Sequence, residues 1–330
     1  MKLVQLSSAS LVASVILLTA NFGFAQSSAI PSTYPNKPIK FVVPYPPGGG
    51  TDVIARIVQE PLSQELGAQI VIDNRGGAGG SIGTDIVSKS PNDGYTVLFT
   101  LSSHTINPAI YPKLSFNTEK DFLPVATVAS LPQILVANND FPAKTVKDIV
   151  ALAKAKPDSI SYASVGNGSP GHLAGAMMAS AAGIKMTHIP YRGGGPAVTD
   201  VMAGQVPLLW VSIPAAANFI KAGKLKALAV STLKRTPVFP DVPTMAELGF
   251  KDFEVDSWYA MFVPAGTSKS IIDRLNQAAN KVLSNSSVKE KLLAQGAEAV
   301  GGTPEALGKV VSAEIPKWTK VVKEANIKAE

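Results

Sequence analysis

Short apolar runs alternate along this chain with longer segments in which apolar residues recur every three or four positions. Ile39–Val43 is the first such run, and the periodic segment Asp52–Leu66 follows it. Continuous apolar runs of about four to eight residues are typical of buried strands, whereas a period of about 3.6 residues is typical of amphipathic helices. The alternation of the two predicts an α/β fold.

The same two patterns continue through the rest of the chain. The further predicted strands are Gln69–Asp73, Thr96–Thr100, Ile134–Ala137, Ile160–Ser164, Thr187–Ile189, Leu208–Val211, Leu228–Val230 and Trp258–Val263. The further predicted helices are Ser81–Ser88, Thr145–Lys154, His172–Ala182, Pro196–Ala203, Pro214–Lys221, Ser268–Leu283, Val288–Gln295 and Pro304–Glu324. A polar loop is expected over Ser102–Thr105, directly after a strand.

The chain is too long for a single typical hydrophobic core, so two domains are expected. We expect the late strand Trp258–Val263 to extend the first sheet, with the closing helices packed on it. The middle of the chain then forms an inserted domain, reached by crossings near Ala126 and Gly249. The predicted domains are 26–126 plus 250–330, and 127–249.

The first 25 residues have the pattern of an export signal. Lys2 gives a positive start, Leu11–Ala20 is apolar, and Gly23–Ala25 fits a cleavage site that leaves Gln26 as the first mature residue. The apolar stretch is shorter than the roughly 20 residues that span a bilayer. With 0 cysteines, the chain has neither disulfides nor a lipid-bearing cysteine. We expect a periplasmic protein that is neither membrane-inserted nor a lipoprotein.

The charges and histidines argue against several classes of function. The net charge of +6 is spread along the chain, and no basic run with interleaved aromatics predicts nucleic-acid binding. His104, His172 and His188 match no zinc spacing, so we expect no bound metal. The absence of a cysteine nucleophile and of paired carboxylates on a loop gives catalysis little support.

Four glycine-rich loops are the candidate functional segments. Each separates an apolar run from a helical pattern, and glycine lets an anion approach the free N–H groups and positive dipole end of a helix N-terminus. Several such loops in one exported chain predict a cleft that holds an anion by its backbone. The loops are Pro46–Asp52, Asn74–Gly80, Gly166–Gly171 and Tyr191–Pro196.

Other interpretations of these loops stay open. Pro46–Asp52 also suits simple turn and cap chemistry. Gly166–Gly171 matches G-x-G-x-x-G, but residues 172–199 lack the acidic residue that a dinucleotide site expects about 20 residues later. Arg192 could clamp a carboxylate, meet the 2′-phosphate of NADP, or lie on the surface. Ser169, in N-G-S-P-G, is one glycine short of a nucleophile elbow.

The ordered set of motifs resembles the Bug, or TctC-like, family of periplasmic solute-binding proteins. The resemblance covers essentially the whole mature chain. Its motifs are YPNKPIKFVVPYPPGGGTD from Tyr34, NRGGAGGSIG from Asn74, DGYTVL from Asp93, HIPYRGGGPAVTDVMAGQV from His188, AGKLKALAV from Ala222, PDVPTMAELG from Pro240 and WYAMFVPAGT from Trp258.

The resemblance implies a type II periplasmic-binding-protein fold, with two α/β domains, a two-strand hinge and a ligand cleft between them. It also implies that strand-end loops of both domains bind a carboxylate, largely through backbone amides and ordered waters. The ligand-binding residues carried over by motif are Gly48, Gly49, Gly50, Thr51, Asp52, Ser102, Ser103 and His104 from one domain, and Ser164, Gly166, Asn167, Gly168, His172, Tyr191, Arg192, Gly193 and Ser212 from the other.

One segment departs from the family pattern. Members often read G-Q-V-D-L-M-F-D-N-x-P where this chain has GQVPLLWVSIP, so Pro207 and Val211 replace two acids and Ser212 follows. An acid in the pocket could pair with an ammonium group. Its loss, with Trp210 nearby, favours a ligand without an amino group, such as an aromatic or aliphatic carboxylate.

The expected function is that of a monomeric receptor without cofactors, which closes on a small organic carboxylate and delivers it to the membrane subunits of a tripartite tricarboxylate transporter. One alternative is a periplasmic sensor that presents its ligand to a signalling partner. The other is an enzyme, either NADP-dependent through Arg192 or of serine type through Ser169.

Overall fold

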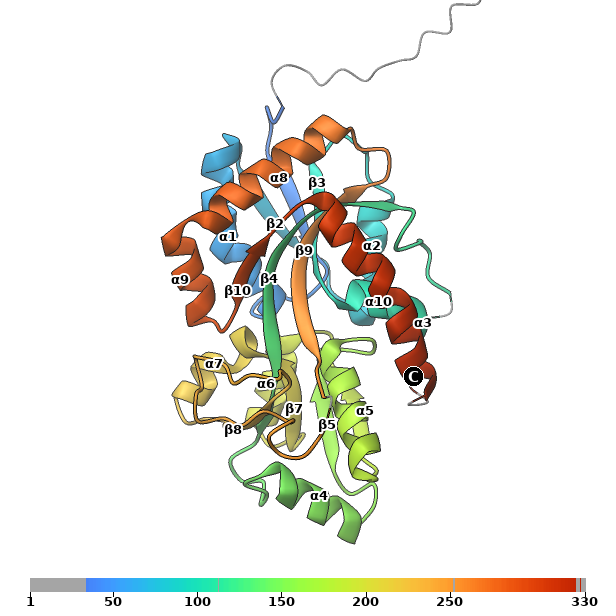
Figure 1. Cartoon of the computed structure of the whole chain (residues 1–330), viewed down its shortest axis with the longest axis vertical. Helices are drawn as coiled ribbons and strands as arrows, with labels where there is room; N and C mark the ends of the chain where they lie inside the picture. Colours follow the sequence, from blue (N-terminus) through green and yellow to red (C-terminus); the bar gives the residue numbers. More distant parts are fainter. Residues whose placement is uncertain (1–33, 112, 252, 325–326, 328–330) are drawn as a thin grey trace, which may run out of the picture.

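Two lobes, stacked along the long axis of the molecule, share one pair of long strands (Figure 1). We describe the chain in a computed structural model that defines residues 34–111, 113–251, 253–324 and 327. The predicted export signal lies outside these residues. No helix in the described part of the chain is both long enough and apolar enough to cross a membrane.

The first lobe is built on a mixed sheet whose strands run in the order β2–β1–β3–β9–β4, with β10 added beside β4. β1 pairs in parallel with β2 and β3, and β9 lies antiparallel between β3 and β4. The prediction that the late strand extends the first sheet is therefore confirmed. The bounds are β1 Ile39–Val43, β2 Ile70–Asn74, β3 Thr96–Leu101, β4 Phe122–Ala137, β9 Asp256–Pro264 and β10 Glu298–Gly301.

The second lobe continues from the far half of β4. There β4 pairs antiparallel with β7 and β8, and β5 lies parallel between β7 and β6. The helices α4 to α7 of this lobe alternate with its strands. The bounds are α4 Val146–Ala155, β5 Ser161–Ser164, α5 Pro170–Ala182, β6 Thr187–Pro190, α6 Gly194–Met202, β7 Leu208–Ser212, α7 Ile213–Lys221 and β8 Lys226–Val230.

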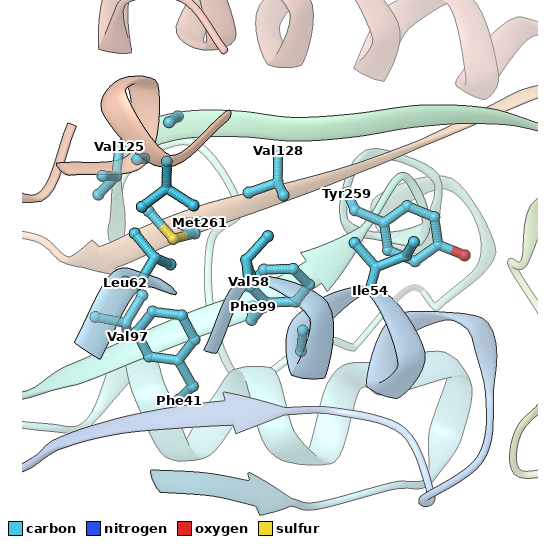
Figure 2. Close-up of a cluster of buried hydrophobic side chains, with 14 of the residues drawn as sticks. Phe41, Ile54, Val58, Leu62, Val97, Phe99, Val125, Val128, Tyr259 and Met261 are labelled. Carbon is cyan, nitrogen blue, oxygen red and sulfur yellow. The ribbon is translucent and has the colours of Figure 1, made fainter. Parts of the chain in front are cut away.

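The apolar face of helix α1 shows how sequence period becomes packing. Ile54, Val58 and Leu62 recur every fourth residue, lie on one side of the helix, and are buried against the first sheet. Figure 2 shows them facing Phe41, Val97 and Phe99 of β1 and β3. The ring of Tyr259 lies at one end of this cluster with its hydroxyl directed away from it (Figure 2).

Helices cover the remaining faces of the first lobe. The long α8 packs against α1 and β4, and α10 packs against α3 and β4. The bounds are α1 Gly50–Leu66, a 3₁₀ turn Ala78–Gly80, α2 Ser81–Ser88, α3 Ser103–Ile110, α8 Lys269–Ser284, α9 Ser286–Ala294 and α10 Pro304–Glu324.

Strand β4 is much longer than the predicted strand Ile134–Ala137. It starts at Phe122, and its pairing changes from β9 to β7 and β8 between Pro132 and Gln133. Two prolines concealed this strand in the sequence, because proline lacks the N–H that a ladder needs. Pro124 sits at a register shift, and Pro132 lies where the pairing changes, so both positions tolerate the loss.

Two elements were missed in the sequence. The predicted polar loop Ser102–Thr105 is wrong, because Ser103–Ile110 forms the helix α3. Its short, polar pattern and the internal Pro108 gave no helical signal. The short strand β10 pairs with β4 and was also not predicted. The predicted domain boundaries near Ala126 and Gly249 stay predictions.

Candidate functional site

The four glycine-rich loops come together where the two lobes face each other. Gly49 of the first loop lies against Gly194 of the fourth, because a Cβ added at Gly49 would be 3.5 Å from the Gly194 nitrogen. A Cβ at Gly166 of the third loop would be 3.5 Å from Gly79 of the second. Backbone meets backbone across the lobes at both places, and a Cβ added at Gly79 would collide with the Asn167 carbonyl oxygen, so only glycine fits there. The sequence predicted these loops separately, and the fold places them together.

A small cavity of about 10 Å³ lies between the first, third and fourth of these loops. That volume accommodates about one water molecule, so the loops that line the cavity must move apart both to admit and to hold an organic carboxylate. None of the described residues that line the cavity carries a charge. They are Tyr45, Gly49, Gly50, Thr51, Leu101, Gln133, Val165, Pro170, Gly194, Ser212, Ser257 and Tyr259.

Helix N-termini from both lobes end at this cavity. Gly50 is the first residue of α1 in the first lobe, while Gly194 begins α6 and Ser212 immediately precedes α7 in the second. Among the described residues, none of these three helices has a side chain that caps its free N–H groups. Side chains cap α4, α5 and α9, whereas α2, α3 and α8 also lack a side-chain cap, so it is the convergence of three such N-termini on one cavity that distinguishes this place. The N–H groups at the cavity are therefore available to an anion.

Hydroxyl groups supply the other donors at the cavity. Burial raises the pKa of Tyr259 to about 12, although the hydroxyls of Ser212, Ser257 and Thr51 around it act in the opposite direction. The phenol therefore stays protonated near neutral pH and can donate a hydrogen bond. Tyr45 is already engaged, because its hydroxyl donates to the Gly79 carbonyl at 3.1 Å.

Asp52, predicted as a ligand-binding residue, instead holds the first loop in shape. Its carboxylate accepts hydrogen bonds from the Gly48 N–H at 3.0 Å, Arg56 at 2.9 Å and Asn74 at 3.1 Å. Burial raises the pKa of this carboxyl, but these three donors outweigh burial and leave it below its ordinary value. The Gly48 N–H is therefore occupied by Asp52.

Hydrogen bonds to Ser164 and His172 hold the Gly166–Gly168 loop, and His188 contacts both of these residues. The Ser164 hydroxyl lies 2.7 Å from His188 Nε2 and accepts from the Gly166 N–H at 3.1 Å. The Gly168 N–H donates to His172 Nδ1 at 3.3 Å. The two imidazoles stack with centroids 3.8 Å apart. These residues fix the loop and do not line the cavity.

The two histidine rings are held neutral. Burial lowers the pKa of His172 to about 4. Burial, reinforced by the neighbouring His172, lowers the pKa of His188 to about 3. A neutral ring keeps Nδ1 of His172 able to accept the Gly168 N–H, so the loop keeps its shape at neutral pH.

Asn167 makes contacts across the lobes. Its carbonyl accepts a hydrogen bond of 3.3 Å from the hydroxyl of Tyr111, which follows α3 in the first lobe. Its side-chain Oδ1 is buried and has no hydrogen-bond partner among the described residues. Asn167 therefore lies at the lobe interface without lining the cavity.

The predicted segment Ser102–His104 lies in the first lobe, behind the cavity. His104 packs against Phe122 and Phe262, with ring centroids 5.0 and 4.7 Å away. Phe262 and Tyr259 belong to opposite faces of the sheet, so His104 lies on the side away from the cavity. Ser103 lies beside the Tyr45 phenol, and the Ser102 hydroxyl is buried without a partner among the described residues.

The fourth loop contributes its glycines and not its charged side chain. Arg192 is exposed and is not among the residues that line this cavity. The phenol of Tyr191 donates to Asp200 at 2.7 Å, away from the cavity lining. Gly193 precedes α6, and a Cβ there would press on the Pro46 ring at 2.5 Å. The structure does not place Arg192 as a clamp on a ligand in this cavity.

The segment Gly204–Pro214, which departs from the family pattern, is arranged differently from the expectation that Trp210 lies near the ligand. Trp210 is fully buried in the core of the second lobe, where it stacks on Phe253 at 5.9 Å, and it does not face the cavity. Val211 packs beneath Gly194, with its Cγ2 3.6 Å from a Cβ placed there. Of the replaced positions, Val211 therefore adjoins the cavity wall, whereas the neighbouring Trp210 does not line the cavity.

The sequence missed the lining residues that come from the shared strands. Gln133 lies on β4, and Ser257 and Tyr259 lie on β9, where these strands pass between the lobes. A buried strand pattern conceals such positions. The available signal was polar residues within otherwise apolar strands, as at Gln133 and Tyr259, or near the start of one, as at Ser257.

The comparisons with known proteins agree with this arrangement. The family model TctC, "Tripartite tricarboxylate transporter family receptor", matches residues 54–327. The chain is similar to protein BugT of Bordetella pertussis, with 39% identity over 90% of this chain and 91% of BugT.

Two solved structures with ligands are also similar to this chain. One is "R. palustris Rpa4515 with adipate", at 35% identity and a TM-score of 0.87, covering 89% of this chain and 99% of that one. The other is "MatC (Rpa3494) from Rhodopseudomonas palustris with bound malate", at 32% identity and a TM-score of 0.84, covering 88% and 100%. They confirm the two-domain periplasmic-binding-protein fold, and the chain belongs to the tripartite tricarboxylate transporter receptor family of periplasmic solute-binding proteins.

Proposed function

We propose that this protein captures a small organic carboxylate in the periplasm and delivers it to the membrane subunits of a tripartite tricarboxylate transporter. One observation carries the proposal: uncapped N-termini of α1, α6 and α7, drawn from both lobes, end at one cavity. Backbone N–H groups at helix N-termini favour anions through hydrogen bonds and through the helix dipole. A carboxylate between the lobes would satisfy donors from both.

The ligand is a carboxylate without an amino group. The cavity lining offers neutral donors, and no carboxylate among its described residues could pair with an ammonium group. Val211 adds an apolar side chain at its edge, beneath Gly194. The names of two similar structures give adipate and malate as their ligands, and neither molecule carries an amino group.

Closure of the lobes is the mechanism of capture. A ligand shifts the balance between open and closed forms only through contacts that it makes more favourably in one of them. Contacts with Gly50 and Gly194, which belong to different lobes, exist together only in the closed form. A ligand at about 100 times its dissociation constant would add about 2.7 kcal/mol to the free energy of unfolding.

The protein acts by binding without turnover and as a monomer. Ser169, the candidate nucleophile of the serine-type alternative, accepts a hydrogen bond from the His172 N–H at 3.2 Å and caps α5. Its side chain is fully buried and does not line the cavity. This role explains a serine at that position without chemistry.

Isothermal titration calorimetry with adipate, malate, glutamate and lysine tests the ligand class. We expect saturable binding of at least one of the two carboxylates that lack an amino group and none of lysine. Binding of lysine or glutamate alone would contradict the proposed class. Native mass spectrometry of the purified protein would identify a ligand acquired during expression.

Uptake by a deletion strain tests delivery. Loss of uptake of the bound carboxylate, restored by the complementing gene, is expected for a transport receptor. Unchanged uptake together with a lost transcriptional response to the same carboxylate would support the sensory alternative instead.

A further inference from the structure

A second contact between the lobes lies outside the ligand cavity. Leu173, in the first turn of α5, is fully buried in a cluster with residues of the first lobe. α5 belongs to the second lobe, whereas its partners lie on α3 and α10 (Figure 1). The buried members of this cluster are Ile106, Ile110, Leu173, Trp318 and Val322.

The burial of Leu173 depends on the first lobe. Its neighbours on α5, Ala174 and Met178, pack in the core of the second lobe. Leu173 is not part of that core and belongs to the cluster between the lobes. Because the other buried members of this cluster all lie in the first lobe, Leu173 would become exposed when the lobes separate.

The first-lobe half of the cluster is held in place by one carboxylate. Glu314 of α10 accepts hydrogen bonds at its Oε2 atom from Trp318 Nε1 at 3.3 Å, Thr105 Oγ1 at 2.7 Å and Trp258 Nε1 at 3.1 Å. These donors lie on α10, α3 and β9. Glu314 therefore fixes the Trp318 ring relative to α3, so the surface that receives Leu173 is preformed.

Further contacts across the lobes flank the cluster. The Tyr111 hydroxyl donates to the Asn167 carbonyl at 3.3 Å. A Cβ added at Gly168 would be 3.4 Å from Ile110 Cγ1. The seam between α3 and the second lobe is thus both apolar and hydrogen-bonded.

We propose that Leu173 and its cluster on α3 and α10 form a latch that sets the affinity for the ligand without touching it. The effect on ligand affinity rests on the proposed function. The latch itself is a property of the closed lobes and does not require a ligand. Apolar surface that is buried only on closure favours the closed form with or without ligand. Apparent affinity falls with the population of the form that binds, so weakening the latch weakens binding.

Leu173→Ala tests the latch through affinity for adipate. We expect the dissociation constant to rise about tenfold, which corresponds to about 1.4 kcal/mol. Leu208→Ala, which truncates a buried leucine in the core of the second lobe, is the matched control. It should lower the melting temperature at least as much and leave the dissociation constant within about twofold. An equal loss of affinity in both variants, or none in either, would overturn the proposal.

A cross-linking experiment tests the latch without any ligand. The chain has 0 cysteines, so Gly49→Cys with Gly194→Cys introduces one pair across the lobes, and a Cβ at Gly49 lies 3.9 Å from the Gly194 Cα. The rate of disulfide formation then reports how often the lobes close. Adding Leu173→Asp should slow this rate about tenfold or more.

Leu248→Asp, at an exposed leucine of the second lobe, is the control for the added charge. It should leave the cross-linking rate unchanged. If Leu173→Asp also leaves the rate unchanged, there is no latch. If no carboxylate binds but Leu173→Asp slows the cross-link, the proposed function fails and the latch stands.

Discussion

Gly50 of the first lobe and Ser212 of the second touch so closely that no side chain fits between them. A Cβ added at Gly50 would lie well inside van der Waals contact with the Ser212 hydroxyl oxygen and 2.8 Å from that of Tyr259. Both residues line the ligand cavity. This contact makes Gly50 a sensitive point for closure.

Gly50→Ala should prevent full closure. The added methyl group collides with the Ser212 hydroxyl only when the lobes meet, whereas its contact with Tyr259 lies within the first lobe and requires only a small shift of that hydroxyl, so the folded lobes should persist. We expect at least a tenfold loss of ligand affinity by calorimetry, with an unchanged circular dichroism spectrum. Gly308→Ala on α10, where the nearest atom to a new Cβ is 3.6 Å away, is the control and should bind normally.

Tyr259→Phe removes a donor from the cavity. Because its pKa lies at about 12, the phenol is protonated across the neutral range and can donate to a carboxylate. A hydrogen bond to a charged group contributes about 1.5–3 kcal/mol, so the dissociation constant should rise about tenfold or more. Titration calorimetry of the two proteins measures this, and equal affinities would exclude Tyr259 as a ligand donor.

Arg192→Ala distinguishes two expectations for this residue. The sequence predicts that Arg192 binds the ligand, whereas the structure has it outside the cavity lining. If the guanidinium clamps the ligand, its removal should cost about tenfold or more in affinity. Since Arg192 is exposed and lies outside the cavity lining, we expect a change below about threefold. A large loss, measured by the same titration, would show that Arg192 reaches the ligand after the lobes rearrange.

The buried histidines should make the protein less stable in acid. The pKa values of His172 and His188 are about 4 and about 3 in the fold, against 6.5 for the free side chain. The unfolded chain therefore takes up protons first as the pH falls below 6.5. The contribution of the two neutral rings to the free energy of unfolding is therefore complete above pH 6.5. It is lost progressively as the pH falls toward 4.

Replacing His188 by glutamine isolates this effect. Urea unfolding between pH 4.5 and 7.5 should show a shallower loss of stability for His188→Gln, by up to about 1.4 kcal/mol per pH unit for one proton. The control is the same comparison above pH 7, where the difference between the two proteins should no longer change with pH. Parallel curves over the whole range would contradict a neutral, buried His188.

Asp256 should act in the opposite direction. Its pKa is raised to about 6, first by burial and then by Glu254, with further contributions from Glu298 and Glu314, while Lys317 opposes them. The folded state thus holds a proton that the unfolded state releases at about 3.8. The proton held by Asp256 contributes fully to the free energy of unfolding below about pH 3.8. This contribution is lost as the pH rises through about 6.

Asp256→Asn mimics the protonated carboxyl. We expect it to raise the free energy of unfolding by about 1–2 kcal/mol at pH 8, after allowance for partial exposure, and to have little effect near pH 4. Denaturant titrations at the two pH values measure the difference. A variant less stable than the parent at pH 8 would show that the ionised carboxylate has a favourable partner.

The loops could be found from the sequence because their chemistry is local. Glycine runs after strands mark helix N-termini, and ligand sites in open α/β sheets lie at the carboxyl ends of the strands. The residues that the pattern could not locate depend on tertiary context. Tyr259 and Gln133 sit inside apolar strands, and Arg192 follows β6, the edge strand of its sheet, where a side chain can turn outward.

Helices and strands could be predicted from the sequence where a single hydrophobic period runs through the element. They were missed or shortened where a proline interrupts that period. Helix α1 and strand β1 follow their expected patterns closely. Pro124 and Pro132 divided β4, and Pro108 concealed α3, because local rules treat proline as an end. Tertiary pairing on both sides of β4 outweighed that local preference.

The uncapped helices at the cavity have a cost for the protein as a whole. Asp or Ser at position 49, where a Cβ would meet no atom closer than 3.5 Å, could satisfy exposed N–H groups of α1 and add a few tenths of a kcal/mol to the stability of the protein. Such a side chain would also imitate the ligand from within and compete for the same donors. Selection for recognition therefore keeps this part of the chain less stable than its own sequence could make it.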